Sequence, residues 1–286
     1  MLQLGTLLAL ACALATNVAL LCKHRGAAAA PSVELRRPLW SARALFRSTW
    51  WTIGFAIATG AWALHVVALA IAPLSVVETT ISGGLVLLAW LAERWFGVHL
   101  GIREWLGLGL CAGGLALLAA TSGQSADPGS GYSTAAMIPF EATAVGAGLA
   151  LLLSGSSRSS RGSSGALLGV AAGLLLGVAN VAVKALTGTV PGDPTSIVSP
   201  WTLVALIAGV GAFFALARGL QLGAAIPVIT LTTVAANVVS VIGGVLVFGD
   251  SIGGDPLGVA VRCVAFVAVI AAAALMPGQL RSARVT

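Results

Sequence analysis

The sequence predicts an all-α, polytopic membrane protein with nine transmembrane helices. Three observations lead to this fold class: the composition, the spacing of long apolar segments, and the side on which the basic residues fall. Hydrophobic residues make up 58% of the 286 residues and charged residues 8%, and the mean hydropathy is +1.01. A soluble domain carries about 25% charged residues. This chain therefore has too little polar surface to cover a water-soluble particle.

Nine segments are long and apolar enough to cross a bilayer, which takes about 20 apolar residues. The predicted spans are 2–22, 49–71, 73–92, 104–121, 133–153, 165–187, 201–218, 223–248 and 254–276. The first is a retained span rather than a signal peptide, because its basic residues follow the apolar run instead of preceding it. Pro73 separates the second span from the third, since one helix over 49–92 would be too long for the bilayer.

The loops on one side of the predicted bundle hold 13 of the 15 Lys and Arg residues. These residues are Lys23, Arg25, Arg36, Arg37, Arg43, Arg47, Arg94, Arg103, Arg158, Arg161, Arg218, Arg281 and Arg284. The loops of the other side hold none, and contain Asp127, Asp193, Asp250 and Asp255. By the positive-inside rule the basic side is cytoplasmic. We therefore expect a multi-pass protein of the plasma (inner) membrane, with the N-terminus outside and the C-terminus in the cytoplasm.

Two of the predicted cytoplasmic loops have a distinctive composition. In the loop 23–48, the segment PLWSARALFRSTWW places Arg43 and Arg47 four residues apart among large apolar side chains. This pattern predicts a short interfacial helix on an anionic leaflet; a basic loop that only sets the topology is the alternative. The segment SGSSRSSRGSSG at 154–165 predicts a flexible linker by its composition.

The two halves of the chain resemble each other. The first span ends ATNVALLCK and the sixth ends GVANVAVKA, which aligns Asn17 with Asn180. The third and eighth spans each combine a Pro, a Thr-Thr pair, a Gly-Gly pair and an acidic residue (Glu93, Asp250) at the end. Five spans separate equivalent helices, so the copies enter the membrane in opposite senses, as in transporters built from inverted repeats. The predicted units are 1–121 (spans one to four), 122–164 (span five and the Ser-rich loop), 165–276 (spans six to nine) and a cytoplasmic tail, 277–286.

With this whole-length pattern, the sequence resembles the drug/metabolite transporter superfamily, whose members include EamA-like proteins. The resemblance is carried by APLSVVETTISGGLVLLAWLAERWFGVHLGIREWLGLGLCAGGLALLA and its counterpart in the second half. The usual form of the superfamily has ten spans. A nine-span chain resembles its NIPA-like branch, and WWTIGFAIATGAW followed by ALAIAPLSVVETT is similar to the second-to-third span region of that branch. The branch resemblance implies magnesium transport, whereas the superfamily moves very different solutes.

Five ionisable residues fall inside the predicted spans: His65, Glu78, Glu141, Lys184 and Arg262. At 1.5 Å per residue, all five lie roughly 5–12 Å from the external end of their spans. A lone charge facing lipid costs at least about 2.5–3.5 kcal/mol, so we expect the carboxylates and cations to share one layer inside the bundle. The layer is either a set of structural ion pairs, with Lys184 free to reach the membrane surface, or the lining of a site for solute or a coupling proton.

Uncharged polar residues complete the candidate solute- or proton-binding set: Asn17, Asn180, Asn237, Thr79 and Thr80. Asn237 lies nearest to the centre of its span. A Thr side chain in a helix often bonds back to a carbonyl of its own helix, so each Thr taken singly has a structural explanation as well.

These features predict a secondary transporter of a small polar solute that works by alternating access between the two repeats. Magnesium is the alternative substrate, because Mg²⁺ takes one or two carboxylates and Glu78 and Glu141 could supply them. Lys184 and Arg262 at the same depth instead favour an anionic or zwitterionic solute. A non-transporting membrane subunit or a lipid-handling accessory protein is the second alternative.

An enzyme is not expected from this sequence. It has no nucleotide-binding glycine loop, no metal-ligand cluster and no Ser/His/Asp set at one membrane face. We therefore expect no cofactor and no nucleic-acid partner. The expected partners are the solute or ion and the anionic lipids of the cytoplasmic leaflet.

Overall fold

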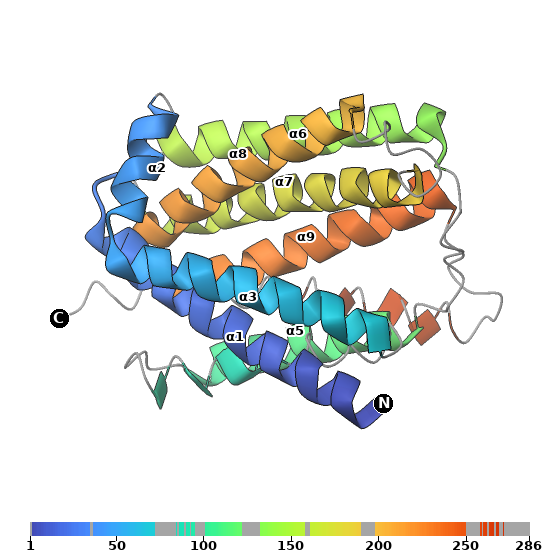
Figure 1. Cartoon of the computed structure of the whole chain (residues 1–286), viewed down its shortest axis with the longest axis horizontal. Helices are drawn as coiled ribbons and strands as arrows, with labels where there is room; N and C mark the ends of the chain where they lie inside the picture. The colour runs from blue at the N-terminus through green and yellow to red at the C-terminus, as the bar shows by residue number, and fades with distance from the viewer. Residues whose placement is uncertain are drawn as a thin grey trace.

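The chain is an all-α membrane protein. The computed structural model describes residues 2–34, 37–71, 101–121, 132–157, 161–189 and 198–249, with single positions between 84 and 94 and between 258 and 271. The helices with defined bounds are α1 (Leu2–Ala29), α2 (Pro38–Phe46), α3 (Thr49–Ile71), α5 (Ile102–Thr121), α6 (Thr134–Ser157), α7 (Arg161–Thr189), α8 (Pro200–Leu222) and α9 (Ala225–Phe248) (Figure 1).

Five stretches within the described helices are long and apolar enough to cross a membrane. They are Leu7–Ala29, Thr134–Gly155, Ser164–Leu186, Pro200–Leu222 and Ala225–Phe248. Helix α3 has the bounds predicted for the second span, and α5, α8 and α9 begin and end within four residues of their predictions. The third and ninth spans, 73–92 and 254–276, fall largely outside the described residues, as does the break at Pro73.

Two predicted loops are partly helical instead. Helix α1 continues past residue 22 to Ala29, because an Ala run strongly favours the helix and the next breaker is Pro31. In the segment predicted as a flexible linker, α6 continues to Ser157 and α7 already begins at Arg161.

Tertiary packing explains the early start of α7. Ser164 is fully buried, and a Cβ on Gly165 would lie 2.5 Å from the Cα of Gly223. A Ser/Gly-rich composition therefore does not keep this segment unstructured when the ends of α7 and α8 meet.

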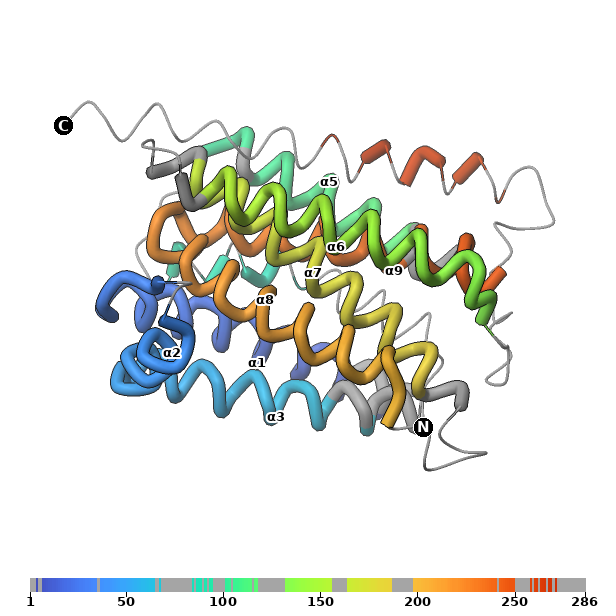
Figure 2. The backbone as a smooth tube through the Cα atoms, turned by 90° about the horizontal axis from the view of Figure 1, so that it is seen from above, coloured from blue at the N-terminus to red at the C-terminus, as the bar shows by residue number. Residues whose placement is uncertain are grey.

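The helices form an up-and-down bundle (Figures 1 and 2). Helix α1 packs mainly against α3, and α7 packs against α8, α9 and α6. Helices α1 and α7 run in opposite directions along the bundle in both views. The short helix α2 lies at one end of the bundle, together with the C-terminal ends of α1 and α8 and the start of α3. This end is called the α2 end below.

The largest hydrophobic core lies at the α2 end and joins both halves of the chain. Leu21 and Trp51 from the first half share one buried cluster with Leu220, Ile226 and other residues of the second half. The phenylalanine rings of α2, α3 and α8 continue this contact: Phe46 lies 5.2 Å from Phe55 and 6.4 Å from Phe213, measured between ring centroids. At the opposite end, the described core cluster comes from α6 to α9 alone.

Glycines let α7 and α9 approach closely along their length. Gly165, Gly169, Gly173 and Gly177 recur every four residues of α7, which places them on one face. A Cβ on Gly173 would lie 2.6 Å from the Cβ of Ala235 and 3.1 Å from the backbone nitrogen of Ala236. Such spacing by small residues is a common way to pack helices in lipid, where apolar burial drives association less than in water.

The substitution Gly173→Ala should therefore destabilise the bundle. The added methyl group meets backbone of α9 that cannot rotate away, and overpacking of this kind costs about 1–3 kcal/mol. The matched control is Gly146→Ala on α6, where the added Cβ meets nothing within 4 Å. Thermal unfolding of both purified variants in one detergent measures the difference. Equal melting temperatures for the two variants would show that the α7–α9 contact is looser than described.

Candidate functional site

The structure describes five of the ten candidate residues with their side chains: Asn17, Glu141, Asn180, Lys184 and Asn237. His65 lies in α3, but its side chain is not described. Glu78, Thr79, Thr80 and Arg262 lie outside the described residues. Of the predicted layer of two carboxylates and two cations, the structure therefore describes one carboxylate, Glu141, and one cation, Lys184.

Glu141 is a buried carboxylate in the middle of an apolar helix interface. Its side chain is 4% exposed, and neither Oε1 nor Oε2 has a hydrogen-bond partner among the described residues. Met137, one turn earlier on α6, belongs to a core cluster with α7 and α9. Ala144 and Val145, one turn later, pack against residues of α7 and α8. The carboxyl group thus lies on the face of α6 that helices α7, α8 and α9 cover.

A proline lies close to Glu141 in the same helix. Pro139 is inside α6 and has no N–H, so the carbonyl four residues earlier loses its helical donor. The Thr143 hydroxyl donates to the Pro139 carbonyl at 2.7 Å. An acid, a proline and a back-bonded threonine within five residues make this the most polar stretch of an otherwise apolar span. Buried polar groups are normally hydrogen-bonded, and no such partner for the Glu141 carboxylate lies among the described residues.

Lys184 has an aromatic neighbour. Its Nζ lies 4.3 Å from the centroid of the Phe248 ring at the C-terminal end of α9, a distance typical of a cation–π contact. The Glu141 carboxylate accepts no hydrogen bond from Lys184. Of the two cations expected in the layer, Lys184 thus lies against an aromatic ring, and Arg262 lies outside the described residues.

The two aligned asparagines both bridge helices. Asn17 is buried, and its Nδ2 donates to the carbonyl of Gly84. Asn180 donates from Nδ2 to the Ser240 hydroxyl oxygen at 3.4 Å, and its side chain is exposed. Each contact joins the first helix of a half to the segment around the Gly-Gly pair of the same half.

The polar residues of α9 mostly bond to their own helix. Asn237 Nδ2 donates to the Thr233 carbonyl at 2.9 Å, and the Thr233 hydroxyl donates to Ile229. The Thr232 hydroxyl lies 2.9 Å from both the Val228 carbonyl and the Gly169 carbonyl of α7. Thr232 therefore stabilises the α7–α9 contact. The bond of Asn237 uses Nδ2, so its Oδ1 can accept a hydrogen bond from another group.

One important residue did not stand out in the sequence. Gln221, at the end of α8, makes four hydrogen bonds at the α2 end. Its Nε2 donates to the carbonyls of Ala27 and Pro31, both at 3.0 Å, and its Oε1 accepts from the Val33 nitrogen at 2.9 Å. Arg218 supplies the fourth bond, from Nη1 to Oε1 at 3.2 Å. The position next to the tight α8–α9 turn was the only signal available in the sequence.

A metal site is not formed by the described part of the chain, where no group of three or more His, Cys, Asp or Glu residues comes together. The carboxylate pair suggested for Mg²⁺, Glu78 with Glu141, has one member outside the described residues. Comparison with protein-family models, curated proteins and solved structures finds no significant match to this chain.

Proposed function

We propose that the chain is a secondary transporter of a small polar solute, with a fold like that of the drug/metabolite transporter superfamily. The observation that carries this proposal is the unpartnered carboxylate of Glu141, buried in a membrane-spanning helix. Ionisable residues inside membrane spans are costly and mark ion, proton or solute pathways. An acid that braces helices would have a donor, and Glu141 has none among the described residues.

Nine spans and two inverted repeats, 1–121 and 165–276 with 122–164 between them, are part of this proposal. Three observations support the repeat. Helices α1 and α7, which begin the two units, run in opposite directions (Figure 1). Each packs strongly against the next long helix of its unit, α3 or α8. Asn17 and Asn180 each reach the Gly-Gly segment of their own unit.

The contacts between the halves indicate which side of the transporter is closed. Gln221 and the phenylalanine cluster join the two halves at the α2 end. If this end is cytoplasmic, the structure represents a state closed to the cytoplasm, and transport requires these contacts to separate. Rocking of one repeat against the other around a midplane site is the expected motion.

The substrate class follows from the described cations and acids. A single buried carboxylate at Glu141 suits a proton or a solute with a cationic group. Magnesium stays the alternative substrate, since Glu78 could complete a carboxylate pair. A stabilisation screen of the purified protein with amino acids, amines, organic acids and Mg²⁺ identifies the solute. Flux in proteoliposomes then tests whether that solute is transported.

Orientation gives a separate test. We expect the α2 end to face the cytoplasm, because the described basic residues Lys23, Arg25, Arg43 and Arg47 lie in or beside the helices that meet there. In a variant without the native cysteines, Ser133→Cys, just before α6, should react with an impermeant maleimide in intact cells. Ser32→Cys, after α1, should react only after permeabilisation. The reverse labelling pattern would overturn the orientation.

A further inference from the structure

The helix α2 exposes an unusual mixture of side chains. Its buried face carries Ser41, Ala44 and Leu45. At 100° per residue, the exposed side chains occupy an arc of about 120° in the order Phe46, Leu39, Arg43, Arg47, Trp40. Leu39 is 87% exposed and Trp40 50% exposed. Large apolar side chains thus flank the two arginines on both sides, and their exposure to water is unfavourable.

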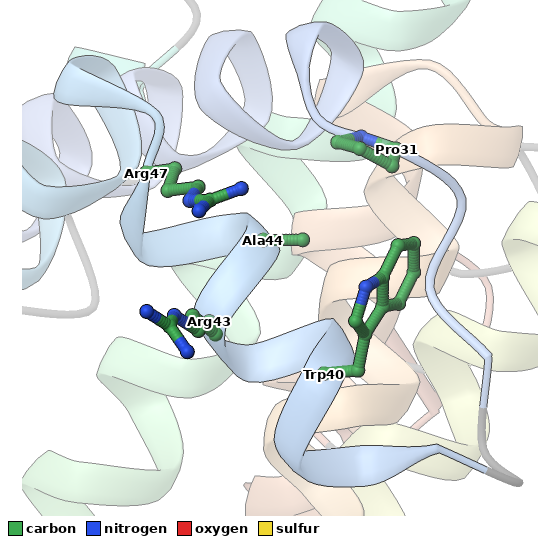
Figure 3. Close-up of a pocket in the computed structure, with 5 residues that line it drawn as sticks. All are labelled: Pro31, Trp40, Arg43, Ala44 and Arg47. Carbon is green, nitrogen blue, oxygen red and sulfur yellow. The ribbon is translucent and has the colours of Figure 1, made fainter.

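A pocket opens beside this face. It has a volume of about 330 Å³ and is lined by Pro31, Trp40, Arg43, Ala44 and Arg47. Trp40 and Pro31 stand on one side of Ala44, and the two arginine side chains extend from the other (Figure 3). The volume is at the lower end of the range for small-molecule sites, about 300–1,000 Å³, and suits a phosphate with its glycerol rather than a large ligand.

The wall of the pocket is fixed from both sides. The Glu34 nitrogen donates to the Ser41 hydroxyl, which in turn donates to the Glu34 carbonyl, both at 3.0 Å. The Val33 nitrogen donates to Gln221. The segment that contains Pro31 is therefore held between α2 and α8, which fixes this wall of the pocket.

We propose that this pocket binds the phosphate headgroup of an anionic phospholipid. Arg43 and Arg47 are both exposed and both line the pocket, so their guanidinium groups can donate to phosphate oxygens. Leu39, Trp40 and Phe46 would contact the glycerol and upper acyl carbons, as in interfacial helices. A soluble phosphate would use the arginines and leave these three apolar side chains in water, which favours the lipid as the ligand.

Native mass spectrometry of the full chain in detergent tests the proposal. Phosphatidylglycerol is titrated against phosphatidylcholine with the same acyl chains and against soluble glycerol phosphate. We expect specific phosphatidylglycerol adducts on the wild type. The double variant R43Q/R47Q should bind this lipid about tenfold to thirtyfold more weakly, because each basic residue near an anionic headgroup contributes to affinity.

The control variant R94Q/R103Q removes the same charge from two exposed arginines outside the pocket, and should bind the lipid like the wild type. The melting temperature of each variant establishes that it is folded. Equal weakening in the two double variants would overturn the proposal, because only net charge would then matter. Equal affinity for phosphatidylcholine, or displacement of the lipid by glycerol phosphate at similar concentrations, would overturn it as well. The outcome is independent of solute transport, so it does not stand or fall with the proposed function.

Discussion

Replacing Glu141 with glutamine should give a folded protein that no longer moves solute. The amide keeps the size of the side chain but can neither carry a charge nor exchange a proton. Because the carboxylate has no hydrogen-bond partner among the described residues, its removal breaks no hydrogen bond within that part of the chain. The expected result is loss of saturable flux in proteoliposomes, at least about a hundredfold below the wild type if the carboxyl group binds the solute or coupling ion directly. The variant E34Q, at an exposed acid of the loop after α1, should keep its flux.

The melting temperatures of Glu141 variants distinguish a role in transport from a structural role between helices. In Glu141→Leu, an apolar side chain replaces a buried polar group without a partner, and such a group costs about 1–3 kcal/mol. We therefore expect Glu141→Leu to unfold at a higher temperature than the wild type while transport is lost, the usual trade-off at functional residues. A structural acid would behave in the opposite way, because removing one member of a buried pair costs about 3–5 kcal/mol. A marked fall in melting temperature in both variants would contradict the assignment.

Replacing Gln221 with alanine should weaken the closed state of the α2 end. The change removes four hydrogen bonds, three of which join α8 to the segment 27–33 of the other half. Each bond contributes about 0.5–1.5 kcal/mol net. Their combined loss is comparable with the free-energy difference of a few kcal/mol between two conformations of a protein. The distance between spin labels at Thr49→Cys and Ala224→Cys, in a background without native cysteines, reports the separation of the halves. We expect a longer-distance population to appear in Gln221→Ala.

The isosteric change Gln221→Glu is the sharper control for this residue. It keeps an oxygen for the Val33 nitrogen but places a carboxylate against the carbonyls of Ala27 and Pro31, which accept hydrogen bonds and cannot donate them. It should therefore open the α2 end at least as much as alanine does. Distance distributions identical to the wild type in both variants would show that Gln221 fixes a loop and not the state of the transporter.

The helical fold was largely predictable from the sequence, because long apolar segments in a membrane protein have few structures available to them. Helix α3, Thr49–Ile71, has the bounds predicted for the second span, and Pro38–Phe46 forms a short helix where one was expected. The predictions failed where local composition competes with packing. Ser and Gly near residue 161 suggested a linker, yet the contact between Gly165 and Gly223 holds this segment in α7.

The burial of one candidate residue was predictable from the sequence, and the contacts of the candidate residues were less so. The cost of a charge in lipid correctly placed Glu141 inside the bundle. The same argument placed it in one layer with Lys184 and Arg262; Lys184 lies over Phe248, and Arg262 lies outside the described residues. Depth along a helix follows from residue counting, but the direction of a side chain around the helix depends on neighbours far away in the sequence. Three of the four bonds of Gln221 are of this kind, since their partners lie 188 to 194 residues earlier.

Solute flux into proteoliposomes is the most direct test that this chain is a transporter with Glu141 in its pathway. The solute is the one that best stabilises the purified protein in the screen of amino acids, amines, organic acids and Mg²⁺. We predict saturable uptake by the wild type above that of empty liposomes, and uptake at the empty-liposome level for folded Glu141→Gln. Wild-type liposomes without saturable uptake of any stabilising solute would instead indicate a non-transporting membrane subunit. Undiminished uptake by Glu141→Gln would remove the buried carboxylate from the mechanism.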